Sequence, residues 1–112
     1  MSKKKRKKNN YFTKFHENVI LEYISATDNK HRNELYKGII QPVFVEMINK
    51  IVFTYKFTNL PNIENLKSEC EMHLVTILSN FDPTKGSKAF SYFSVITKNW
   101  FIAKVKKNAI QL

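Results

Sequence analysis

The scarcity of turn-forming residues restricts the fold of this chain more than any other feature. Its 112 residues include only two glycines and three prolines, whereas a small sandwich or barrel needs the many tight turns that these residues form. A few long helices need almost none of them. Because 43% of the residues are hydrophobic, the chain has enough apolar side chains to bury one core. The sequence therefore predicts a single all-α domain, a compact bundle of four to five helices.

Apolar residues recur at three- and four-residue intervals in several stretches of the chain, a spacing typical of amphipathic helices. Pro42 either kinks one long helix or lies in the first turn of a new one. We expect residues 1–10 to be a disordered basic tail and residues 11–108 to be the folded domain. The predicted helices cover residues 11–26, a short segment that starts near 33, and residues 43–57, 63–81 and 89–107.

Charged residues are distributed unevenly along the chain. Residues 1–8 hold six cations and residues 83–112 hold six more, and neither segment contains an acid. Residues 9–82 hold seven cations and nine acids, so the middle of the chain is slightly negative although the formal net charge is +10. Cationic ends are typical of a protein that binds a polyanion such as nucleic acid. A solubilising tail and a solvated helix face are the alternative explanation.

The sequence contains no pattern typical of an enzyme. Its two glycines, Gly38 and Gly86, do not belong to a phosphate-binding loop. The histidines lie in separate segments, without the spacing that two ligands of one metal ion need; they are His16, His31 and His73. We therefore expect a protein that is not an enzyme and that has no cofactor and no metal site.

The single cysteine and the absence of long apolar stretches suggest a cellular location. Cys70 cannot form an intramolecular disulfide, and it lies on the apolar side of its predicted helix as a small core residue does. No stretch is long and apolar enough for a membrane span, and the lysine run is not followed by the apolar core of a signal peptide. We expect a soluble protein of the reducing cytoplasm, with the nucleus as the alternative because the lysine run also fits a nuclear localisation signal.

The C-terminal part of the chain combines aromatic and basic side chains in one predicted helix. Lysines neutralise phosphates, and exposed aromatic rings stack on the bases of single-stranded or melted nucleic acid. The alternative is that the aromatic residues form the inner face of the helix, which we favour for Phe101 and Ile102. This helix is therefore a candidate for binding melted DNA.

Residues 65–91 contain a recognisable motif. An amphipathic helix ends in Phe81-Asp82, a Pro-x-x-Gly turn begins at Pro83, and Phe90-Ser91 opens an aromatic-rich helix. This pattern resembles region 2 of the bacterial RNA polymerase sigma factors. The spacing from Phe81 to Phe90 is most similar to that of the small late-transcription sigma factors of T-even-like phages, and the resemblance extends over about residues 10–107.

The resemblance implies two binding surfaces. In sigma factors the first of these helices binds the coiled coil of the polymerase clamp, and the matching residues are Asn65, Ser68, Glu69 and Met72. The following helix binds and melts promoter DNA. The residues expected to bind DNA are Lys88, Phe93, Ile96, Thr97, Lys98, Trp100, Lys104, Lys106 and Lys107. Ile96 and Thr97 stand where bacterial primary factors carry a pair of tryptophans.

The resemblance further implies a function in transcription initiation. We expect a phage-type sigma factor that binds core RNA polymerase in the cytoplasm of a bacterial host cell and melts an AT-rich −10-like promoter element. Late phage factors of this type use a DNA-tracking sliding clamp, so a sliding clamp or a coactivator is among the candidate partners. Two other functions stay open at this point: a basic architectural protein that coats nucleic acid, and a polymerase-binding regulator that does not recognise a promoter.

Overall fold

The computed structural model describes the backbone of residues 11–111 and the side chains of residues 11–108. The predicted basic tail, residues 1–10, lies outside them. The described part of the chain forms five α-helices joined by turns. They are α1 (Lys14–Ser25), α2 (Asn29–Leu35), α3 (Gln41–Thr54), α4 (Ile63–Ile77) and α5 (Ala89–Gln111). The prediction of an all-α fold is therefore confirmed.

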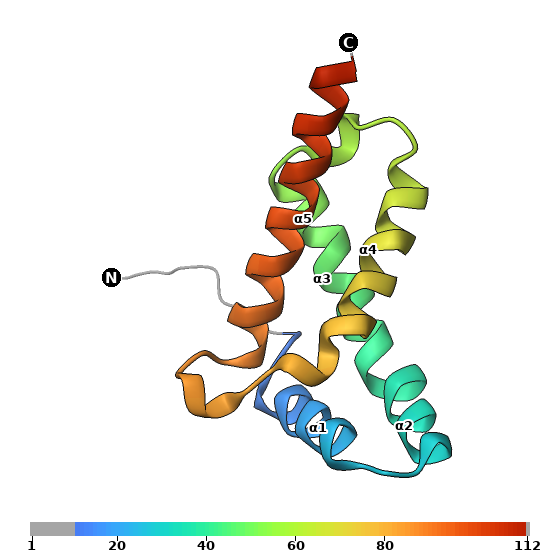
Figure 1. Ribbon diagram of the computed structural model, residues 1–112, viewed down its shortest axis with the longest axis vertical. Coiled ribbons are helices and arrows are strands. Elements are labelled where there is room, and N and C mark those ends of the chain that lie inside the picture. The colour runs from blue at the N-terminus through green and yellow to red at the C-terminus, as the bar shows by residue number, and fades with distance from the viewer. Residues whose placement is uncertain (1–10, 112) are drawn as a thin grey trace.

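Helices α2 and α3 are joined end to end by a π-helical turn, Tyr36–Ile40, so the five helices make four rods (Figure 1). Pro42 lies in the first turn of α3, where a backbone N–H would have no acceptor within α3 itself. The rod begins at Asn29, earlier than the expected start near residue 33. The reason is a cap: the side chain of Asp28 accepts a hydrogen bond from the backbone N–H of Lys30 (3.2 Å).

Helices α3, α4 and α5 run side by side along the length of the molecule, and α1 and α2 lie at one end of them (Figure 1). Helix α3 packs against both α4 and α5 and is the central helix of these three. Its inner side meets the inner sides of both neighbours in one core. The largest fully buried side chains include Phe44, Met47, Ile48, Leu74, Leu78, Phe93 and Phe101.

A buried carboxylate ties α1 to the start of α5. Glu17 Oε1 accepts a hydrogen bond from the backbone N–H of Ala89 (2.7 Å), and Oε2 pairs with the ammonium group of Lys14 (2.9 Å). Burial alone would raise the pKa of Glu17, but the hydrogen bond from Ala89 and the charge of Lys14 outweigh it and hold the pKa below its usual value. The ionised carboxylate therefore satisfies a backbone donor at the first turn of α5.

A second carboxylate fixes α4 against the rod formed by α2 and α3. Glu71 accepts hydrogen bonds from the hydroxyl of Tyr36 (2.8 Å) and from the side-chain amide of Gln41 (2.6 Å). Burial and the neighbouring Glu71 carboxylate raise the pKa of Tyr36, so its hydroxyl stays protonated and donates. Together with the burial of Cys70 and Leu74, this contact orients α4 in the bundle.

The turn between α4 and α5 is built from the Pro-x-x-Gly motif. The carboxylate of Asp82 accepts hydrogen bonds from the backbone N–H (2.9 Å) and the hydroxyl (2.7 Å) of Thr84, and these bonds lower the pKa of Asp82. A short 3₁₀ turn, Pro83–Lys85, follows and ends at Gly86 with φ of 95°. A left-handed conformation of this kind favours glycine, so the motif determines where α5 begins.

Candidate functional site

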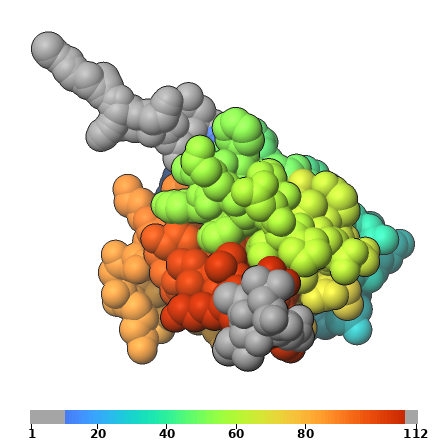
Figure 2. All heavy atoms as spheres, turned by 90° about the horizontal axis from the view of Figure 1, so that it is seen from above, coloured from blue at the N-terminus to red at the C-terminus, as the bar shows by residue number. Residues whose placement is uncertain are grey.

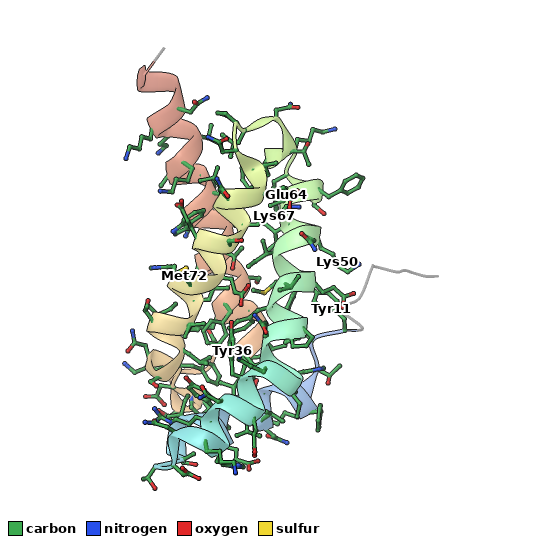
Figure 3. All side chains as sticks on the ribbon, turned by 90° about the vertical axis from the view of Figure 1, so that its right-hand side faces the viewer. Tyr11, Tyr36, Lys50, Glu64, Lys67 and Met72 are labelled. Atoms are coloured by element: carbon green, nitrogen blue, oxygen red, sulfur yellow. The ribbon has the colours of Figure 1, made fainter. Side chains whose placement is uncertain are left out.

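The outer side of α4 brings together the four residues predicted to bind polymerase. All four side chains are exposed, and their spacing places them on one side of the helix. Met72 is 67% exposed and points away from the bundle in Figure 3. We call this surface the α4 face; its residues are Asn65, Ser68, Glu69 and Met72.

The inner side of α4 holds the α4 face in place. Cys70 and Leu74 are fully buried, which confirms the prediction that Cys70 is a core residue. Burial raises the pKa of the Cys70 thiol to about 12. The thiol is therefore protonated at neutral pH and is not a reactive nucleophile.

A shallow groove between α3 and α4, which was not predicted from the sequence, lies beside the α4 face. Its volume is about 200 Å³. On its α4 side, the ammonium group of Lys67 bonds the carboxylate of Glu64 (3.2 Å), and both residues are labelled in Figure 3. The groove is lined by Val45, Ile48, Asn49, Glu64, Lys67, Ser68 and Glu71. Because Ser68 belongs to both surfaces, the groove extends the α4 face toward α3.

Two residues predicted to bind DNA lie inside the protein instead. Phe93 and Thr97 are fully buried, because α5 turns the stripe of Ala89, Phe93, Thr97 and Phe101 toward the core. The ring of Phe93 packs against Phe44, with centroids 5.2 Å apart. The hydroxyl of Thr97 donates to the carbonyl of Phe93 (2.8 Å). In this structure neither side chain presents a surface to DNA, contrary to the expectation.

The remaining predicted DNA-binding residues, which lie in α5 or directly before it, keep some or all of their side-chain surface in solvent, and they divide into two groups. Ile96, Trp100, Lys104 and Lys107 follow one another at three- and four-residue steps along one side of the helix. The ammonium group of Lys104 lies 4.7 Å from the ring centroid of Trp100, so the structure brings these two residues together. The second group does not lie on this side of the helix; it comprises Lys88, Lys98 and Lys106.

Tyr55, the residue that caps the C-terminus of α3, was not among the site residues predicted from the sequence. Its ring is half exposed, and the ammonium group of Lys98 lies 5.1 Å from its centroid. Figure 2 looks onto this end of the bundle and shows the segment after α3 against α5. Periodicity within one helix carries no signal for such a pair, since its members lie far apart in the sequence.

The side chains of residues 109–112 lie outside the described residues. In the part of the chain that the structure describes, no three His, Cys, Asp or Glu side chains are grouped to hold a metal ion. None of the described helices has the length and hydrophobicity needed to cross a membrane.

Comparison of the chain with protein-family models, with curated proteins and with solved structures gave no match.

Proposed function

We propose that this protein is a sigma factor of the late phage type. It binds core RNA polymerase through the α4 face and helps to open an AT-rich −10-like promoter element with α5. It catalyses no reaction itself; polymerase supplies the chemistry. The sequence resemblance around the Pro-x-x-Gly turn suggested this function, and two surfaces of the bundle support it.

The α4 face suits a protein partner. Exposed Met72 offers an apolar contact at one end of the face, and Glu69, Ser68 and Asn65 add polar groups along the preceding two turns of the helix. Methionine is enriched in protein interfaces, which also contain direct hydrogen bonds from polar groups. The adjoining groove adds the half-exposed side chain of Val45 and the carboxylate of Glu64. A basic or mixed-charge coiled coil would complement such a surface.

Helix α5 suits nucleic acid, and the pairing of Trp100 with Lys104 is the observation that carries this part of the function. An accessible indole ring provides a stacking surface for an unpaired base. A lysine beside it neutralises a phosphate of the same strand. Residues 83–112 contain no acid to repel that strand, and Lys107 lies on the same side of the helix as Lys104. Phe93 and Thr97 contribute by packing, since they hold α5 in the bundle.

Transcription in vitro tests the function as a whole. Core polymerase supplemented with the chain should start transcripts at defined positions on DNA from the cognate genome. Uniform coating of DNA without binding to polymerase would favour the architectural function. Binding to polymerase without a defined start site would favour a regulator.

The variant Glu69→Lys tests the α4 face. It should weaken binding to core polymerase, while the free energy of unfolding changes by less than about 0.5 kcal/mol because the side chain is exposed. Glu34→Lys makes the same charge change at an exposed position of α2 and serves as the matched control. Equal polymerase affinity of both variants would contradict a role of the α4 face.

A further inference from the structure

A row of four aromatic rings connects the end of α3 to α5. Tyr55 stacks on Phe57 with centroids 6.1 Å apart, and Phe57 stacks on Phe101 at 5.4 Å. Phe101 meets Trp100 edge to face at 5.0 Å. The two middle rings are buried, whereas Tyr55 is 50% exposed and Trp100 is partly exposed. The buried rings therefore support an accessible ring at each end of the row.

Each accessible ring carries a lysine from α5. The ammonium group of Lys98 lies 5.1 Å from the centroid of Tyr55, and that of Lys104 lies 4.7 Å from the centroid of Trp100. The two ends of the row are thus built alike, although only one of them was recognised in the sequence.

We propose that Tyr55 is a second base-stacking residue and that the pairs Tyr55–Lys98 and Trp100–Lys104 bind two separate bases of one nucleic-acid single strand, which passes around α5 from one pair to the other. This inference rests on the proposed function, in which α5 binds melted promoter DNA, and it adds a contact from α3.

At each end of the row, a nucleobase can replace the lysine on the ring, because the base binds the ring more strongly than the ammonium group does. A cation over an exposed ring contributes less than a nucleobase stacked on that ring. An incoming base therefore displaces the ammonium group from the ring face. The freed lysine is long and flexible, so it can reach the phosphate next to the stacked base. Each pair of ring and lysine thus binds the base and the phosphate of a nucleotide.

The charge around the row selects this ligand. Both lysines belong to the segment 83–112, which contains no acid, so an anionic partner complements them. A planar π-system that stacks on Tyr55 is supplied by every nucleobase, and it is exposed when the strand is unpaired. Duplex DNA offers phosphates to the lysines but keeps its bases stacked within the helix.

Fluorescence anisotropy of a labelled oligothymidylate tests the inference with the full chain. A length of about 12 nucleotides lies within the site sizes of known single-strand-binding domains. Tyr55→Ala should weaken binding about 5- to 150-fold, whereas Tyr55→Phe should bind like the wild type because it keeps the ring. Phe53→Ala is the matched control, since Phe53 is an aromatic residue of the same helix end that is 78% exposed; its affinity should be unchanged.

Salt dependence separates stacking from charge. Tyr55→Ala removes no charge, so the slope of log affinity against log salt should stay as in the wild type. Lys98→Gln should reduce this slope by about 0.7, the value for one phosphate contact on a single strand. Emission of Trp100, the only tryptophan of the chain, and thermal unfolding report whether each variant is folded. Tyr55→Leu keeps an apolar contact with Phe57 and should lose affinity as Tyr55→Ala does.

The outcomes distinguish this inference from the function on which it rests. If Trp100→Ala weakens binding and folded Tyr55→Ala and Tyr55→Leu do not, the second stacking position is wrong and the proposed function stands. If neither Trp100 nor Tyr55 matters, or the wild type does not bind the oligonucleotide, both are wrong. An equal loss of affinity for single-stranded and duplex DNA in Tyr55→Ala would also overturn the stacking role.

Discussion

Helices α4 and α5 are neighbours in the bundle, but they distribute their apolar side chains differently. Helix α4 has one apolar side, on which Cys70 and Leu74 are buried, and a mainly polar outer side. Helix α5 carries apolar residues all around: Phe93 is buried, while Val95 is 54% and Val105 39% exposed. A helix with one apolar side has a single way to pack. A helix like α5 has several, and only its neighbours decide among them.

The largest change in the free energy of unfolding is expected when a buried apolar residue of α5 is replaced, and an exposed apolar residue of the same helix is the comparison. Phe93→Ala should lower the free energy of unfolding by about 3–5 kcal/mol, because it leaves a cavity in the core. Val95→Ala, two residues away on the outer side, should change it by less than about 0.5 kcal/mol. Urea denaturation followed by circular dichroism measures both. A stable Phe93→Ala variant that has lost only DNA binding would restore the role predicted from the sequence.

Removal of the link between α1 and the start of α5 should cause the next largest loss of stability. Glu17→Ala leaves the backbone N–H of Ala89 buried without its acceptor, which should reduce the free energy of unfolding by about 1–3 kcal/mol. The carboxyl pKa is lowered in the folded protein. Its stabilising effect is therefore complete above the pKa of an unfolded glutamate, about 4.3, and is lost as the pH falls through the lower folded value.

The pH dependence of the free energy of unfolding distinguishes Glu17 from an exposed carboxylate. Glu17→Gln should flatten the loss of stability in acid, since it cannot ionise. Glu64→Gln removes a carboxylate from an exposed pair with Lys67 and should alter the pH profile little, because exposed ion pairs contribute little to stability. Identical acid unfolding of the wild type and Glu17→Gln would show that Glu17 does not provide the stabilisation.

A smaller effect should arise at the turn that separates α4 from α5. Gly86→Ala should reduce the free energy of unfolding by about 1 kcal/mol, because φ at this position is +95° and side chains other than glycine are strained there. Gly38→Ala should be neutral or raise the stability by about 0.5 kcal/mol, since a Cβ at Gly38 meets no atom within 4 Å. Thermal unfolding compares the two variants. If Gly86→Ala were as stable as Gly38→Ala, the left-handed conformation of Gly86 would be contradicted.

The contrast between α4 and α5 also explains what sequence could predict. The all-α class followed from the scarcity of turn-forming residues, and the resemblance supplied the residues of the α4 face. The core position of Cys70 followed from periodicity, because a helix with one apolar side has one way to pack. The burial of Phe93 and Thr97 did not follow, because α5 is apolar on more than one side. Tyr55 and the groove between α3 and α4 were missed for another reason: each joins residues from different rods, and their proximity exists only after the chain has folded.

Permanganate footprinting of a cognate promoter tests the central claim, that α4 binds polymerase while α5 captures melted bases. With core polymerase, Trp100→Ala should bind polymerase like the wild type but give a weaker footprint of the open bubble on duplex DNA, and a pre-melted template should restore transcription. Polymerase affinity and thermal unfolding are measured on the same samples. A normal footprint with folded Trp100→Ala, or an equal loss of transcription on duplex and pre-melted templates, would contradict the claim that α5 opens the promoter.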